Sequence, residues 1–114
     1  MSETVLEIGI STERERFPAS EVLYIEGDRN YSKFHRQKAV FSLSSKTLAI
    51  YETLLPHFVR IHKRTLVNPA FVDKCLITPN GKVLLVLTNG ATLSIARRRV
   101  VTFRLKYLVG SHYV

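Results

Sequence analysis

The chain has 114 residues, and its 17 Lys and Arg outnumber nine Asp and Glu, giving a formal net charge of +8 at pH 7. This length predicts one domain, residues 1–114, large enough to bury a core without metals or disulfides. Polar residues interrupt each apolar stretch well before the roughly 20 residues that span a bilayer, and MSETVLEI lacks the pattern of a secretory signal. A single cysteine, Cys75, excludes an internal disulfide and fits a cytoplasmic location.

Charge is distributed unevenly along the chain. Seven of the nine acids lie in the first 28 residues with two bases, a net charge of −5, whereas the other 86 residues carry 15 bases and two acids, a net of +13. A strongly basic segment attracts polyanions and speeds their encounter, although a basic surface kept for solubility would show the same excess. We therefore expect an anionic partner.

Short strands dominate the expected secondary structure, because apolar and polar residues alternate over short runs. The expected strands are 5–10, 22–26, 31–35, 40–43, 58–62, 65–67, 71–78, 83–88 and 92–95. Asn80-Gly81 and Asn89-Gly90 predict two successive hairpins, since glycine adopts the positive φ that tight turns need. The sheets are expected to be mainly antiparallel.

Two helices are also expected. Ser44 or Ser45 would cap the first, Pro56 follows its end, and its apolar face would consist of Leu48, Tyr51, Leu54 and Leu55. The second would close the chain, with an apolar face of Val100, Val101, Phe103, Leu105, Tyr107 and Leu108. The expected fold is therefore mainly β, with one or two short helices.

The run FVRIHKRTLVN places cations inside a strand pattern. Its alternation breaks at Lys63, so Lys63 and Arg64 are predicted to form a tight turn or bulge that points two cations outward. Arg60 is expected to join them in neutralising phosphates. His62 either contacts the anionic partner or satisfies a backbone group at the turn.

The sequence SIARRR ends the last expected strand and begins the closing helix. Arg97, Arg98 and Arg99 would lie at the positive end of the helix dipole, a conflict that an external anion would resolve. Backbone N–H groups and guanidinium groups together make a phosphate site, and an arginine also matches the two acceptors of guanine. The alternative is a cluster that only solvates the helix end.

The segment IEGDRNYSKF carries a third set of polar groups. Arg29 and Lys33 are basic, and Asn30, Tyr31 and Ser32 can donate and accept hydrogen bonds, so the loop could contact a sugar-phosphate edge and bases. Taken alone it is an ordinary hairpin loop. It supports an interaction with an anionic partner only in combination with the other two basic segments.

Together these motifs resemble the LytTR DNA-binding domain of bacterial transcription regulators over nearly the full length. The matching segments, in the family's order, are IEGDRNY, the helix end LLP, FVRIHKRTLVN, the NG hairpin and ARRR. The resemblance implies an elongated arrangement of three antiparallel sheets, a three-sheet sandwich with short helices. It also implies two loops in successive major grooves of double-stranded DNA, a contact with the narrow groove between them, and commonly a bent duplex.

The resemblance assigns roles residue by residue. The loop from Arg29 to Lys33 and the pair Arg97 and Arg98 correspond to the major-groove contacts, and Lys63 corresponds to the contact between them. The chain departs from the family pattern at Lys63, Arg64 and Thr65, where arginine, serine and an aromatic residue are common. It also departs at Ala96, where serine is common.

The expected function is that of a sequence-specific, double-stranded DNA-binding transcriptional regulator, cytoplasmic and associated with the nucleoid. Relatives bind paired sites, so a homodimer on DNA is expected without a stable free dimer. Most relatives also carry an upstream receiver domain, which this chain is too short to contain, so a separate signalling partner stays open. The operator, the target genes and the regulating signal do not follow from the sequence.

A small β-rich RNA-binding protein is the alternative. Such sheets usually bind bases by aromatic stacking, whereas the aromatic residues here mostly occupy positions expected to face inward: Tyr31, Phe34, Phe41, Phe58 and Phe71. An enzyme is not expected, because four histidines, one cysteine and two acids after Asp28 assemble no metal or acid/base site. No metal or cofactor is expected.

Overall fold

The computed structural model describes residues 3–107, with side chains through residue 104. These residues form three antiparallel sheets with the strand orders β1-β2, β5-β4-β3-β7-β6 and β10-β9-β8. The strands are β1 (Val5–Ile10), β2 (Glu13–Pro18), β3 (Val22–Asp28), β4 (Tyr31–Arg36), β5 (Val40–Ser44), β6 (Val59–His62), β7 (Thr65–Val67), β8 (Val72–Ile77), β9 (Val83–Leu87) and β10 (Thr92–Ile95). The helices are α1 (Leu48–Leu54) and α2 (Val100–Tyr107), and the 3₁₀ turn η4 (Arg97–Arg99) precedes α2.

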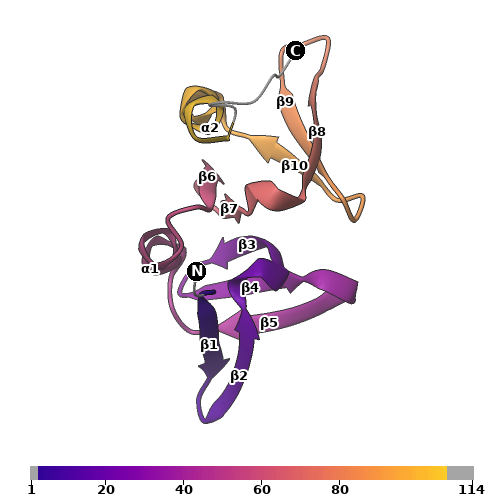
Figure 1. Ribbon diagram of the computed structural model, residues 1–114. Coiled ribbons are helices and arrows are strands. Elements are labelled where there is room, and N and C mark those ends of the chain that lie inside the picture. Colours follow the sequence, from indigo (N-terminus) through magenta and orange to yellow (C-terminus); the bar gives the residue numbers. More distant parts are fainter. Residues whose placement is uncertain (1–2, 108–114) are drawn as a thin grey trace.

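The three sheets are arranged along one long axis. Figure 1 shows β1 and β2 at one end, β8, β9, β10 and α2 at the other, and β6 and β7 between them. The principal extents are 47, 33 and 25 Å, so the molecule is elongated. The three-sheet, mainly β fold expected from the resemblance is confirmed.

Two apolar cores cover opposite faces of the central sheet. In β3, Val22 belongs to the first core and Leu23 to the second, and in β7 Leu66 and Val67 divide in the same way. This is the alternation of a strand that is buried on both faces. The first core adds residues of β1, β2, β4 and α1, and the second adds residues of β9, β10 and α2. The central sheet therefore fixes the positions of both ends of the molecule.

The strand β2 was not predicted. Its sequence Glu13–Pro18 alternates acids and arginines, so the pattern carries no apolar face until Phe17. Phe17 is buried and meets the Phe34 ring edge-on, with centroids 5.9 Å apart. The strand exists because it pairs along β1, a partner that short-range periodicity does not identify.

The first helix begins later than expected. Its N-cap is Thr47, and the Ser44 hydroxyl instead hydrogen-bonds to the Tyr51 hydroxyl inside the core. Leu48, Tyr51 and Leu55 are buried as expected, but Leu54 is 53% exposed, because no sheet covers that side of α1. The expected cap and the inward position of Leu54 are therefore wrong.

The two hairpins around β9 are confirmed. The turn glycines Gly81 and Gly90 have φ of 86° and 88°, the left-handed conformation that favours glycine. The closing helix is also present, and Phe103 is buried as expected. Val101 is 65% exposed, so its expected position on the apolar face is wrong. The side chains of Leu105 and Tyr107, and all of Leu108, lie outside the described residues.

Candidate nucleic-acid interface

The cationic turn between β6 and β7 is held in place by Arg60. Lys63 and Arg64 form the turn with both side chains exposed, as the sequence predicts. Arg60 donates from Nε to the His62 carbonyl at 3.0 Å and from Nη2 to the Lys63 carbonyl, and its Nη1 donates to Glu52 Oε1 at 2.7 Å. Arg60 therefore fixes the turn and shares its charge with a carboxylate, and its expected contact with phosphate stays a prediction.

His62 supports the same turn. Its Nδ1 accepts a hydrogen bond from the Arg64 backbone N–H at 3.2 Å, so a neutral His62 ring carries its proton on Nε2. The side chain is half-buried. Of the two alternatives left open by the sequence, satisfaction of a backbone group is the one observed.

The loop between β3 and β4 presents three polar residues to solvent. Asp28 pairs with Tyr31, so Arg29 and Asn30 form the turn, and Arg29 has a φ of 56°. A non-glycine residue rarely adopts this left-handed conformation, and it persists here at a two-residue hairpin turn. The exposed side chains are those of Arg29, Asn30 and Tyr31.

Ser32 does not share this exposure. Its side chain is 0% exposed, and Oγ donates to the Lys46 carbonyl at 2.7 Å. Strand alternation turns Ser32 toward the first core and Tyr31 and Lys33 toward the opposite face. Burial argues against the expected contact between the Ser32 side chain and DNA, which stays an untested prediction, and this hydroxyl anchors the loop.

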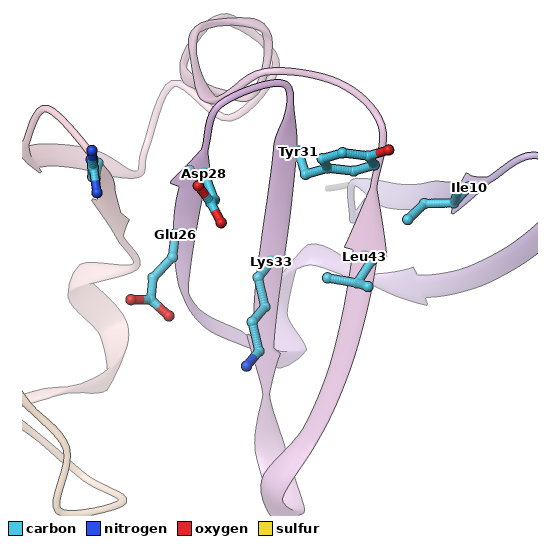
Figure 2. Close-up of a pocket in the computed structure, with 8 residues that line it drawn as sticks. Ile10, Glu26, Asp28, Tyr31, Lys33 and Leu43 are labelled. Atoms are coloured by element: carbon cyan, nitrogen blue, oxygen red, sulfur yellow. The ribbon is translucent and has the colours of Figure 1, made fainter.

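The outer face of β3, β4 and β5 surrounds an open pocket of about 610 Å³. Figure 2 shows Tyr31, Lys33 and Leu43 on one side and Glu26 and Asp28 on the other. The Lys33 ammonium lies 4.2 Å from the centroid of the Phe41 ring, an arrangement that favours a cation.

Two aromatic residues lie on this open face rather than inward. Tyr31 is 49% exposed and Phe41 55% exposed, whereas Phe34 and Phe58 are buried as expected and Phe71 is partly buried. The prediction fails for the first two because Tyr31 in β4 and Phe41 in the edge strand β5 lie on the outer face of the central sheet, which is uncovered there. The inward position of the aromatics is thus a weaker argument against RNA than the sequence suggested.

The junction between β10 and α2 carries the third set of cations. Arg97 and Arg98 are exposed, whereas Arg99 is half-buried and its buried Nε has no hydrogen-bond partner among the described residues. The three arginines form the 3₁₀ turn η4 ahead of α2, not the first turn of the α-helix itself. Arg97 and Arg98 are therefore the two members that present their charge to solvent.

Backbone hydrogen bonds place the β6–β7 turn between the other two segments. The Gly27 N–H, in β3, donates to the Arg64 carbonyl at 2.9 Å. The Ala96 N–H, beside Arg97, donates to the Ile61 carbonyl at 2.7 Å. The β3–β4 loop, the β6–β7 turn and the β10–η4 junction are thus joined in that order, and we call these three segments the basic edge.

Acidic residues neutralise other cations and leave the basic edge charged. Arg36 pairs with Glu15 and Glu21, His35 with Glu26, and Arg60 with Glu52. Among residues with described side chains, no ion pair involves five cations of the basic edge: Arg29, Lys63, Arg64, Arg97 and Arg98. Such a surface attracts an anion without first breaking internal ion pairs.

Burial keeps the His35–Glu26 pair from being a simple ion pair. Burial lowers the pKa of His35, and this effect outweighs the hydrogen bond to Glu26, which acts in the opposite direction. A neutral His35 then donates its Nε2–H to Glu26 and stacks on the Tyr24 ring, with centroids 4.0 Å apart. The Glu26 carboxylate is thereby engaged by a neutral partner within the protein.

The described part of the chain shows no arrangement for metal chemistry. Among these residues no group of three His, Cys, Asp or Glu side chains could hold a metal ion. Within the same part, no helix combines the length and apolar character required to cross a membrane.

These features define a class of protein: an elongated three-sheet β domain with a row of unneutralised cations on surface turns. The family model described as LytTr DNA-binding domain matches residues 13–107, so the chain belongs to the LytTR DNA-binding domain family. That family is a DNA-binding one and not a catalytic one.

A solved structure supports the fold. The chain is similar to the LytTr DNA-binding domain of a putative methyl-accepting/DNA response regulator from Bacillus cereus, with a TM-score of 0.79 and 21% sequence identity. The similarity covers 91% of this chain and 96% of that one. Comparison with functionally curated proteins gives no match.

Sequence reasoning missed two residues near the basic edge. Glu52 lies on α1, and only the fold brings it to Arg60. Lys82 follows the turn glycine Gly81 and lines the same cleft as Arg97. A lysine directly after a hairpin turn in a basic segment was the available signal, but nothing local connects it with Arg97.

Proposed function

We propose that this protein is a sequence-specific regulator that binds double-stranded DNA through the basic edge. The β3–β4 loop and the β10–η4 junction enter successive major grooves, and the β6–β7 turn lies over the narrow groove between them. Two copies occupy paired sites on one duplex. The chain acts as one DNA-binding domain, residues 1–114, in the cytoplasm.

One observation carries this proposal: the three cationic segments are joined in a row by the backbone hydrogen bonds at Gly27 and Ala96. Major-groove contacts on one face of B-DNA lie roughly 34 Å apart, one helical turn. The longest extent of the molecule, 47 Å, accommodates such a separation. A bend in the duplex would seat both outer segments, at an elastic cost of about 1 to 6 kcal/mol.

The roles within the edge follow from side-chain chemistry. Arg97 is the main reader of a base, because its fork matches the O6 and N7 acceptors of guanine, and Arg98 assists it. Lys63 and Arg64 hold the phosphate backbone on either side of the narrow groove. Arg29, Asn30, Tyr31 and Lys33 supply the other groove contact, and Arg60 and His62 position the middle turn.

The experiment that tests the proposal combines selection with a salt titration. Duplexes bound from a random pool should share a sequence, present as a repeated motif if two copies bind. Affinity for the selected duplex, measured from about 50 to 200 mM salt, should fall by about 0.9 log units per log unit of salt for each phosphate neutralised. A single-stranded RNA of matched length and charge serves as the competitor.

Two results would contradict the proposal. Affinity that does not change with salt would exclude a polyanion as the ligand. Steep salt dependence without any selected duplex, and with RNA competing better than DNA, would instead support the RNA alternative.

A further inference from the structure

The turn between β8 and β9 lies beside the β10–η4 junction. Val83 pairs with Ile95, which sets the start of β9 against the end of β10. The turn itself is well defined: the Thr78 N–H donates to the Lys82 carbonyl at 2.9 Å, and the Lys82 N–H donates to Thr78 Oγ1 at 3.0 Å. These bonds fix the backbone of Lys82 next to the segment that carries Arg97.

A cleft of about 260 Å³ separates the turn from the junction. One wall is formed by Gly81, Lys82 and Val83, and the other by Ser94, Ile95, Ala96, Arg97 and Val100. The lining thus contains two cations and a hydroxyl and no acid. Lys82 and Arg97 are both exposed, and neither forms an ion pair with the residues whose side chains are described.

This combination favours an anionic ligand. Two like charges that share one cleft repel each other, and an anion bound between them removes that repulsion. A phosphate suits both partners, because lysine binds it as a point charge and the Arg97 guanidinium has five N–H donors, so one that is not used on a base can donate to it. The Ser94 hydroxyl adds a further donor from the same wall.

We propose that the Lys82–Arg97 cleft binds a phosphodiester of the DNA backbone, at the edge of the major groove that Arg97 enters. This inference rests on the proposed function and adds to it a fourth contact segment, the β8–β9 turn. Lys82 would anchor the strand beside the base that Arg97 reads. Because a phosphate carries no sequence information, this contact strengthens binding to all duplexes alike.

The test compares Lys82→Ala with a matched control, Lys74→Ala. Lys74 is an exposed lysine of the same sheet that does not line the cleft, so both variants lose one charge from a surface position. Lys82→Ala should reduce the slope of log affinity against log salt by about 0.9, equivalent to about eightfold between 1 M and 0.1 M salt. The loss should be equal on selected and random duplexes, and Lys74→Ala should match the wild type.

Neutral methylphosphonate linkages, introduced one at a time, locate the contact. One position should weaken the wild type and Lys74→Ala but leave Lys82→Ala unaffected, because that variant no longer uses the phosphate. Lys82→Arg should restore the sensitivity at this position. If the wild type binds DNA while Lys82→Ala behaves like Lys74→Ala throughout, the inference fails and the proposed function survives.

A second arm separates DNA phosphate from a free phosphate ion. The duplex should shift the backbone amide signals of Lys82 and Arg97, whereas inorganic phosphate at equal ionic strength should shift them only weakly and should be displaced by the duplex. A cleft that binds inorganic phosphate tightly and keeps it in the presence of the duplex would overturn the proposal.

Discussion

Two regions of the molecule differ in whether carboxylates engage their basic side chains. On the side of β3, β4, β6 and α1, acids engage Arg36, His35 and Arg60, and these side chains act within the protein. At the β10–η4 junction, Arg97 and Arg98 have no acidic partner among the described residues. The net charge of the chain therefore does not show which cations can bind a ligand. The positions of a few carboxylates decide which cations are already engaged within the protein.

The largest effect is expected at the β10–η4 junction. Arg97→Ala should lose about 1 to 3 kcal/mol of binding free energy on the selected duplex and should relax its sequence preference, while the unfolding free energy stays unchanged. Lys63→Ala is the companion variant, since it should weaken all sequences evenly. The measurement is affinity for selected and random duplexes. Equal losses on both duplexes for both variants would contradict this division of roles.

The next effect tests Arg60, the ion-paired side chain that supports the middle turn. Arg60→Ala removes the two hydrogen bonds to turn carbonyls and the ion pair with Glu52, so we expect a loss of about 1 to 2 kcal/mol in unfolding free energy. DNA affinity should fall as well, because the turn that carries Lys63 loses its support. Urea denaturation measures the first change and duplex titration the second.

The control for Arg60 is Glu52→Gln, which keeps the side-chain shape and removes only the exposed ion pair. It should change stability by less than about 1 kcal/mol. If Arg60→Ala left stability intact but reduced the salt slope by a full phosphate contact, Arg60 would be a ligand of DNA rather than a support.

A smaller effect is expected at Ser32, the buried member of the β3–β4 loop. Ser32→Ala leaves the Lys46 carbonyl without its hydrogen bond and should lower the unfolding free energy by about 1 kcal/mol. Affinity for the selected duplex should match the wild type once the protein is folded, whereas Arg29→Ala should reduce it. If a fully folded Ser32→Ala protein bound the selected duplex more weakly than the wild type, the Ser32 side chain would contact DNA despite its burial.

The smallest effect concerns pH and His35. Burial lowers the pKa of His35 in the folded state, so the neutral ring is favoured by folding. The contribution of His35 to the unfolding free energy is fully present above the pKa of the unfolded state, about 6.5. This contribution is lost as pH falls from there through the lower pKa of the folded state. The stability advantage of the wild type over His35→Gln, measured by denaturation, should therefore shrink as pH is lowered below 6.5. An advantage that grew instead would mean that the Glu26 carboxylate, not burial, controls the ring.

The sequence by itself determined most of the strands, the two glycine hairpins around β9 and both helices. These features depend on local chemistry: alternation that places Leu66 and Val67 on opposite faces, or a φ of 86° that Gly81 adopts at little cost. The sequence also located the three basic segments and their resemblance to the LytTR family. The roles of their residues in DNA binding remain predictions.

Only the tertiary structure decided which residues of these segments are free. Ser32 is buried because β1, β2 and α1 cover one face of the central sheet, and Arg60 is neutralised because α1 brings Glu52 to it. β2 forms because β1 pairs with it, and Lys82 meets Arg97 because β9 and β10 share a register. Each of these outcomes depends on strand register and on the packing of layers. Local periodicity does not encode them, because it predicts on which face of a strand a residue lies but not which other element packs against that face.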